Sequence, residues 1–291
     1  MSFLRGRYMA LIDLHTHTTA SDGIYPPAKL VDLAVAQGVT ALAVTDHDTV
    51  GGLEEALDRA AERNLLLVPG IEFSIEFTGG SFHLVGLNID HRNAELIEVT
   101  ERLMKLRGTR ISRMVDDLNG KGIAVSEEDV RAEADGKSLG RPHMARALIK
   151  KGHGRDMEDI FRHFLVPGKP GYVKKEKITL PEAVRLIRGA GGIALVAHPV
   201  SLNFEKFTRF VPLLEEFMRQ GVAGIEAYAT MHDENQVGQF LKLAGKYGLA
   251  VSGGSDYHGD KQHEMLGYYG YSRTIPVEIL QPLAERLGIV L

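Results

Sequence analysis

The stretch LIDLHTHTTASDG, residues 11–23, places two histidines and an aspartate directly after a short apolar run. In an extended segment, side chains two positions apart point to the same side, so His15 and His17 can reach one ion. A single pair of this kind is weak evidence. The stretch predicts a strand that ends in a cluster of metal ligands, and the rest of the chain tests whether this pattern recurs.

Histidines and carboxylates follow several later apolar runs. They occur in VTDHD (44–48), VPGIE (68–72), LVAHP (195–199) and GGSDYH (253–258). In a parallel α/β barrel the loops after the strands open on one face, where residues far apart in the sequence meet. Imidazoles mixed with carboxylates suit zinc, manganese or iron. The recurrence therefore predicts a metalloenzyme that gathers several divalent ions.

Composition is typical of a globular enzyme. The chain has 291 residues, 44% hydrophobic and 25% charged, enough for one large barrel or a barrel with an inserted subdomain. It has no cysteine, which excludes disulfides and thiolate ligands. The net charge of -4 disfavours a broad nucleic-acid surface but allows a local basic groove. No apolar run approaches the roughly 20 residues of a membrane span, so we expect a cytoplasmic protein. We assign no function to MSFLRGRYMA at the start.

Strand-like runs alternate with helical patterns. The runs are ALIDL, ALAVT, LLLVP, IALVA, GIEAY and LAVSG, and a helical pattern such as PPAKLVDLAVAQG ends at Gly38. This is repeated βα organisation. Between the fourth and fifth strand regions the pattern is helical only. We therefore expect a barrel formed by residues 10–100 and 179–291, and a helical insertion over 101–178 that roofs the active site.

Four of these motifs resemble those of the PHP family of polymerase and histidinol-phosphatase domains. DLHTHTTASDG, VTDHD, AHP and GSDYH stand in the family's order, and the resemblance covers the whole chain. It implies an α/β fold, a distorted (β/α)7 barrel with a helical insertion subdomain. SLGRPHMARAL and FRHFLVPGKPGYV resemble the standalone bacterial members, which act as nucleoside 3',5'-bisphosphate phosphatases or as 5'-3' exoribonucleases.

The resemblance also implies two to three divalent metal ions. The first would be held by His15, His17, Glu72 and Asp256, the second by Glu72, His83 and His198, and the third by Asp22, His47 and His258. Mn²⁺ is our first choice, with Fe²⁺ or Zn²⁺ as alternatives. Some positions keep another interpretation: His83 opens an apolar run instead of closing one, Glu72 could cap a helix, and Asp22 lies in an ordinary turn sequence.

We expect catalysis by a metal-bridged hydroxide that attacks phosphorus. His198, His232 and Asp256 are the candidate catalytic residues, with His198 or His232 as the acid. Beside His47, Asp46 could orient a ligand imidazole and Asp48 could cap the following helix. The remaining histidines are interpreted as surface or core residues: His91, His153, His163 and His263.

Substrate selection is expected from the insertion. Arg141 is the main phosphate-binding candidate, assisted by His143, although it could instead form a surface salt bridge. A second basic cluster contains Lys105, Arg107, Arg110 and Arg113. It is either a solvated helix face or, with Arg110 as a substrate-binding residue, a site for a second phosphate or a short RNA. Tyr228 and Phe82 lie near site motifs, but no aromatic platform for a base is evident.

These expectations favour a cytoplasmic phosphatase that removes the 3'-phosphate of nucleoside 3',5'-bisphosphates, such as adenosine 3',5'-bisphosphate. The alternatives are a 5'-3' exoribonuclease on short RNA, a histidinol-phosphate phosphatase, and a non-catalytic module stabilised by its metals. We expect a small nucleotide as the partner, possibly short RNA, with no membrane and no obligate protein partner.

Overall fold

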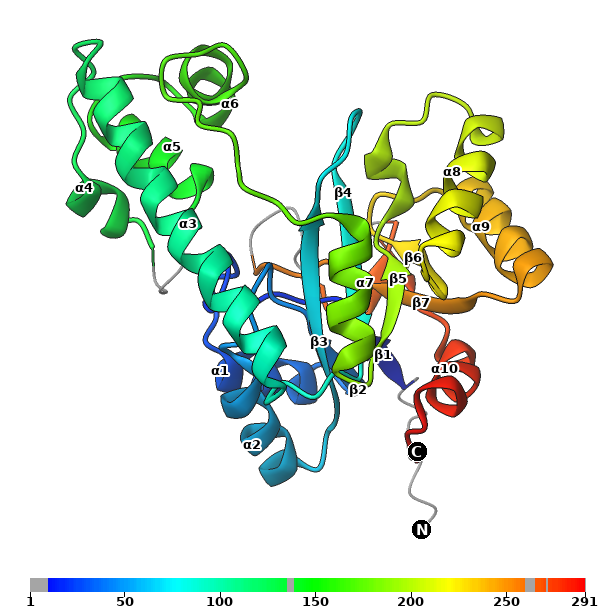
Figure 1. Ribbon diagram of the computed structural model, residues 1–291. Helices are drawn as coiled ribbons and strands as arrows, with labels where there is room; N and C mark the ends of the chain where they lie inside the picture. The colour runs from blue at the N-terminus through cyan, green and yellow to red at the C-terminus, as the bar shows by residue number, and fades with distance from the viewer. Residues whose placement is uncertain (1–9, 135–138, 260–264, 271, 291) are drawn as a thin grey trace.

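The computed structural model describes residues 10–134, 139–259, 265–270 and 272–290. Its centre is a seven-stranded sheet in the order β1 to β7 (Figure 1). The strands are β1 (Leu11–Asp13), β2 (Val39–Val44), β3 (Leu66–Ile75), β4 (Phe82–Leu87), β5 (Ile193–Val196), β6 (Gly224–Ala229) and β7 (Ala250–Gly254). The sheet nearly closes, because the backbone N–H of Leu14 donates to Gly253 O at 3.0 Å. The predicted distorted α/β barrel is confirmed.

Helices pack around this sheet. They are α1 (Pro27–Ala36), α2 (Leu53–Arg63), α7 (Leu180–Gly189), α8 (Phe207–Arg219), α9 (Glu234–Tyr247) and α10 (Leu280–Leu287). In α1 the buried residues Leu30, Val31 and Ala34 recur at helical spacing and face the barrel core. The helix ends where predicted, since Gly38 adopts φ +83, a left-handed conformation that favours glycine. Among the described residues a short hairpin, β8 (Tyr268–Tyr269) and β9 (Arg273–Thr274), precedes α10.

One strand of the barrel runs in the opposite direction. β4 is antiparallel to both β3 and β5, with Ser74 opposite His83 and Leu84 opposite Val196. The start of β4 therefore lies beside the ends of its neighbours. This reversal explains why His83 opens an apolar run in the sequence and yet belongs to the same face of the barrel as residues that close one.

Most of the chain between β4 and α7 forms a helical lobe. It contains α3 (Ala94–Asn119), α4 (Glu127–Arg131), α5 (Arg141–Lys150), α6 (Met157–Ile160) and the π-helix η1 (Phe161–Leu165). The lobe has its own hydrophobic cluster, which includes Ile111, Met114 and Leu148. Helix α3 links the two parts, because its first half contributes Leu96 and Leu103 to the barrel core. The predicted boundary at residue 101 thus falls inside one continuous helix.

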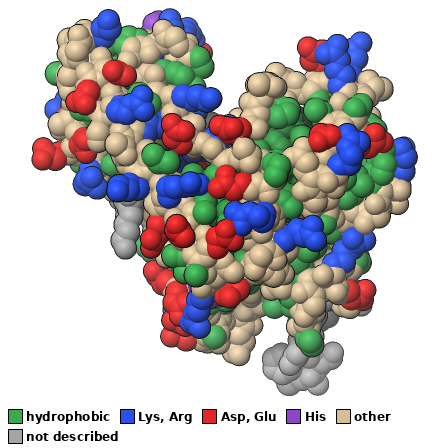
Figure 2. All heavy atoms as spheres, viewed as in Figure 1, with side chains coloured by type: hydrophobic (Ala, Val, Ile, Leu, Met, Phe, Trp, Pro, Cys, Tyr) green, Lys and Arg blue, Asp and Glu red, His purple; other side chains and the backbone are tan. Residues whose placement is uncertain are grey.

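The helical lobe and the segment around α8 stand on either side of a hollow above the barrel (Figures 1 and 2). On this face of the lobe, lysines and arginines stand among acidic side chains, as Figure 2 shows in blue and red. Among the described residues, no helix combines the length and the apolar character needed to cross a membrane.

Candidate metal centre

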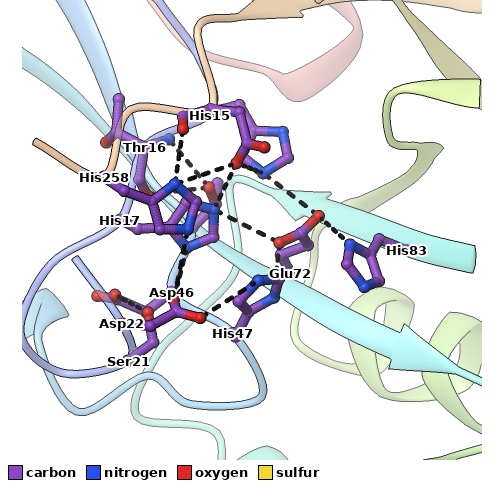
Figure 3. Close-up of polar contacts among 12 residues, drawn as sticks. His15, Thr16, His17, Ser21, Asp22, Asp46, His47, Glu72, His83 and His258 are labelled. Carbon is purple, nitrogen blue, oxygen red and sulfur yellow. Dashed lines mark hydrogen bonds and ion pairs between the residues drawn. The ribbon is translucent and has the colours of Figure 1, made fainter. Parts of the chain in front are cut away.

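Glu72 lies at the centre of the polar cluster at the barrel face (Figure 3). It is fully buried on β3, so the alternative that it caps a helix is wrong. Five imidazoles surround its carboxylate: His47 Nδ1 at 2.7 Å, His83 Nδ1 and His198 Nε2 at 3.0 Å, and His15 Nε2 and His17 Nε2 at 3.4 Å. An arrangement of one carboxylate among five imidazoles suits a ligand shared between ions.

Asp256 approaches the same cluster from the end of β7. Its Oδ1 lies 3.0 Å from His17 Nε2 and 3.5 Å from His15 Nε2. The backbone of Asp256 is left-handed, with φ 57, which turns the chain sharply after the strand. Gly254 permits the close approach of β7 to β1, because a Cβ atom there would lie 2.1 Å from the Cβ of His15. The paired glycines of the GGSDYH motif therefore have a steric role.

Asp22 collects the remaining predicted ligands. Its carboxylate lies 3.5 Å from His258 Nε2 and 3.9 Å from both His17 Nδ1 and His47 Nε2. It also lies 3.5 Å from Arg107 Nη2, which reaches down from α3. The turn sequence around Asp22 is therefore part of the cluster and not an isolated surface turn.

Three overlapping groups of these side chains can hold a metal ion. They are His15 with His17, Glu72 and Asp256; His17 with Asp22, His47 and His258; and His47 with Glu72 and His83. The first matches the predicted set, the second adds His17 to its predicted members, and the third has His47 where His198 was predicted, although His198 also contacts Glu72. Several of these buried atoms have no partner in hydrogen-bond geometry among the described residues, including both ring nitrogens of His17. Such atoms are costly unless ions bind them, so the side chains fit divalent metals.

Burial and neighbouring charges give the imidazoles of the cluster different pKa values. Burial, together with the neighbouring His258, lowers the pKa of His17 to about 3. Burial also disfavours the charged form of His258, but Asp256 and Asp22 outweigh it and raise the pKa of His258 to about 10. Glu72 is buried as well, yet His47 and His83 hold its pKa well below the usual range. The carboxylates are therefore ionised and His17 is neutral, which are the protonation states that metal binding requires.

The sequence analysis missed two carboxylates that support residues of the metal cluster without belonging to it. Glu226 on β6 lies 3.0 Å from His15 Nδ1 and accepts the backbone N–H of His198 at 2.6 Å. Asp13 on β1 accepts from Ser255 N–H at 2.9 Å and Ser255 Oγ at 2.6 Å. The available signal was an acidic residue inside an apolar strand, as in GIEAY, because such a residue needs a buried partner.

Both predictions for the aspartates beside His47 were wrong. Asp46 accepts from the backbone N–H and the hydroxyl of Thr18 at 2.7 Å and from Ser21 Oγ at 2.5 Å, so it shapes the loop that carries Asp22. Among the described residues it forms no hydrogen bond with an imidazole. Asp48 accepts from Ser74 instead of capping α2, which begins after Gly52 without a side-chain cap.

The two candidate acids lie in different surroundings. His198 contacts Glu72 through Nε2 and Ser201 Oγ through Nδ1 at 2.9 Å. His232 is buried, with Nδ1 2.9 Å from Ala227 O and its ring against Phe240, and burial lowers its pKa. Neither His198 nor His232 is among the residues that line the cavity described below. Of the other histidines, His91, His153 and His163 make local contacts near the surface, and His263 lies outside the described residues.

A cavity of about 1090 Å³ lies between the metal cluster and the insertion. Asp22, His47 and His83 line its floor. The cavity is also lined by six cations from the insertion and the segment that leaves it: Arg107, Arg110, Arg141, Lys174, Lys175 and Lys177. The volume is in the range of small-molecule sites. The concentration of positive charge suits an anionic ligand with more than one phosphate.

The arginines are held by local contacts. Arg110 Nε donates to Val173 O at 2.7 Å, and Arg141 Nη1 lies 3.4 Å from Leu165 O with its guanidinium 5.7 Å from the Phe161 ring centroid. Arg107 has a buried Nη1 without a hydrogen-bond partner in the described part of the chain. The predicted basic cluster therefore divides: Arg107 and Arg110 face the cavity, whereas two members, Lys105 and Arg113, are exposed.

His143 and the predicted aromatic residues lie away from the cavity lining. His143 Nδ1 accepts the backbone N–H of Gly140 at 3.0 Å and so shapes the start of α5, which carries Arg141. Phe82 packs on Phe217, and Tyr228 on Tyr269. The aromatic side chains that do line the cavity were not singled out from the sequence; they are Phe77, Phe161 and Tyr172.

Comparison with known proteins agrees with this site. The model of the PHP domain matches residues 13–160. The chain is 37% identical to a 3',5'-nucleoside bisphosphate phosphatase of Chromobacterium violaceum, over 86% of this chain and 88% of that protein. It is 36% identical to a 5'-3' exoribonuclease of Haemophilus influenzae, over 84% of this chain and 89% of that protein.

A solved structure from Bifidobacterium adolescentis, named provisionally as a metal-dependent phosphoesterase, superposes with a TM-score of 0.79. It is 26% identical, and the match covers 96% of each chain. The motifs, the barrel with its reversed strand, the His/Asp/Glu clusters and these relatives agree, and the chain belongs to the PHP domain family.

Proposed function

We propose that the protein hydrolyses the 3'-phosphate of nucleoside 3',5'-bisphosphates, with adenosine 3',5'-bisphosphate as the representative substrate. The observation that carries this proposal is that six cations and part of the His/Asp/Glu cluster line one and the same cavity. A bisphosphate has two phosphates at opposite ends of a ribose. One can reach the cluster while the other is bound by the arginines.

We propose that the three groups hold two to three divalent ions, with Mn²⁺ first because availability and geometry decide more than ligand type at a site of nitrogen and oxygen ligands. When bound, such ions lower the pKa of a water and neutralise phosphoryl oxygens. Glu72, at the junction of the groups, would bridge two of them. Glu226 would fix the orientation of His15 by holding its Nδ1.

The residues of the insertion bind and orient the substrate. Arg107, Arg110 and Arg141 would bind the second phosphate, because guanidinium groups match phosphate oxygens in a bidentate manner. Phe161 or Tyr172 offers an aromatic face to the base, and the lobe limits access of bulk water to the cluster. Between the two candidate acids, His198 is better placed than His232, because it contacts the cluster directly.

A 5'-3' exoribonuclease activity remains the second candidate. It is favoured by Lys174 and Lys177, which extend the cationic lining along the segment that leaves the insertion and could contact an RNA backbone. Histidinol phosphate has one phosphate and a cationic amine, so the positive cavity disfavours it. A cytoplasmic location stays a prediction from the sequence.

The experiment compares three substrates with the Mn²⁺-loaded protein: adenosine 3',5'-bisphosphate, a 5'-phosphorylated RNA oligonucleotide and histidinol phosphate. Fast release of phosphate from the bisphosphate, with 5'-AMP as the product, supports the proposal. If the protein prefers the oligonucleotide, the exoribonuclease activity replaces the proposed phosphatase activity. If none of the three substrates is turned over while metal is bound, the hypothesis of a non-catalytic module stabilised by its metals would remain.

A further inference from the structure

Lys175 connects the insertion to the two barrel segments that carry His47 and Glu72. Its ammonium lies 2.6 Å from Asp48 Oδ2 and donates to Ser74 Oγ at 2.5 Å. Asp48 directly follows His47, and Ser74 comes two residues after Glu72 on β3. Lys175 therefore contacts the neighbours of two residues of the metal cluster.

Lys175 contacts the place where the segments of Asp48 and Ser74 meet, which is buried and where the backbone bends at Asp48. Asp48 donates its backbone N–H to Glu72 O at 2.9 Å, and its Oδ1 accepts the N–H of Ser74 at 2.8 Å. Asp48 is 4% exposed and has a φ of 56°, in the left-handed region that residues with a Cβ seldom adopt. Among the described residues, Lys175 is the cation that pairs with Asp48. Loss of that ammonium would leave a buried carboxylate without a counter-charge, which is strongly unfavourable.

The segment that carries Lys175 is fastened at both ends. At one end, Ile178 forms a parallel bridge with Ile75, and Glu76 N–H donates to Ile178 O at 2.8 Å. At the other end, Val173 O accepts from Arg110 Nε on α3 at 2.7 Å. Lys175 thus lies midway on a short connection between a cavity-lining arginine and the strand that bears Glu72.

We propose that Lys175 is a positioning residue, which holds the His47 and Glu72 segments in the geometry that metal binding requires and couples this geometry to the insertion. The inference rests on the proposed metal cluster. Lys175 also lines the cavity, so the competing role is that of a simple substrate-binding cation. The two roles differ in what they predict for metal affinity.

The test compares Lys175→Met with Lys174→Met. Lys174 is exposed, lines the same cavity and forms no ion pair within the described part of the chain, so its replacement removes the same charge without touching Asp48. Calorimetric titration of Mn²⁺ into the metal-free proteins gives a readout that needs no substrate. We expect Mn²⁺ affinity to fall about 10–100-fold in Lys175→Met, the range for residues that orient metal ligands, and to stay at the parental value in Lys174→Met.

Kinetics provides a second readout. Lys175→Met is expected to lower kcat, Lys174→Met to raise KM for adenosine 3',5'-bisphosphate, and Lys175→Arg to recover much of the metal affinity. Parental Mn²⁺ affinity in Lys175→Met, with only a higher KM, would make Lys175 a substrate cation and overturn the proposal. If the parental protein has no bisphosphate activity, the calorimetry still decides the role of Lys175, so the two failures can be distinguished.

Should circular dichroism show that Lys175→Met does not fold, Asp48→Asn and the Lys175→Met/Asp48→Asn pair replace it, because the pair leaves no buried carboxylate without a counter-charge. Asp48→Asn removes the charge that Lys175 balances, so we expect it to lower Mn²⁺ affinity. Adding the substitution at Lys175 should change this affinity little further, because both substitutions act through one contact. Independent, additive losses from the two substitutions would contradict the proposal.

Discussion

The carboxylate of Glu226 lies 3.0 Å from Nδ1 of His15, on the side of the ring opposite to Nε2, which faces Glu72 and Asp256. Contact at Nδ1 sets the tautomer and the direction of the ring, because the nitrogen aimed at the cluster then keeps its lone pair for a metal. Residues behind the cluster therefore matter for metal binding as well as those in it.

Glu226→Gln should weaken Mn²⁺ binding about 10–100-fold, since an amide holds the imidazole less strongly than a carboxylate. Calorimetric titration of the metal-free protein measures this, with Glu278→Gln, an exposed site, as the control. Equal affinities in the two variants would show that Glu226 has no part in orienting His15.

Arg141→Met should raise KM for adenosine 3',5'-bisphosphate by about tenfold or more, because a charge-assisted contact with phosphate contributes about 1.5–3 kcal/mol. The effect on kcat should be smaller. Arg113→Met, on the exposed side of α3, serves as the control in steady-state assays. An unchanged KM in Arg141→Met would assign the second phosphate to other cations.

Metal binding by the group around Asp22 should strengthen with pH. The pKa of His258 in the metal-free protein is raised to about 10, so its imidazole is protonated at neutral pH and must lose that proton to bind an ion. Affinity should therefore rise from neutral pH towards about 10, with proton release into the buffer. Calorimetry in two buffers of different ionisation enthalpy measures the release, and binding without proton release would argue against ligation by His258.

The same shift has a consequence for the metal-free fold. A histidine whose pKa is raised on folding, from 6.5 to about 10, contributes stability that is fully present below 6.5 and is lost as the pH rises through about 10. Urea unfolding of the metal-free protein between pH 7 and 10 should show this loss, and His258→Gln should flatten the profile. An identical profile in the variant would contradict the assignment.

Gly254→Ala should destabilise the protein by more than about 3 kcal/mol, because the new Cβ would lie 2.1 Å from the Cβ of His15 and the strands would have to separate. Gly245→Ala, at an open position in the last turn of α9, is the matched control and should stabilise by up to about 1 kcal/mol. Urea unfolding measures both. A small effect at Gly254 would mean that β1 and β7 can move apart without cost.

The periodicity of the sequence predicted the strands and the positions of most polar residues at the barrel face. His15, His17 and Asp256 could be found this way because each lies within a few residues of a strand end, and strand geometry is a local property. The helical pattern of the insertion was readable for the same reason.

Contacts between segments that are far apart in the sequence could not be predicted from periodicity. The sequence alone determined the barrel with its insertion, the motifs and the set of candidate ligands, since these depend on local pattern. Only the tertiary structure decided that Glu226 supports His15, that Asp48 pairs with Lys175, and that Arg107 faces the cavity while Arg113 faces solvent. The physical reason is that these choices depend on which strands and helices pack together. A half-turn rotation of a helix, or a reversed strand such as β4, changes the partners without changing the local pattern.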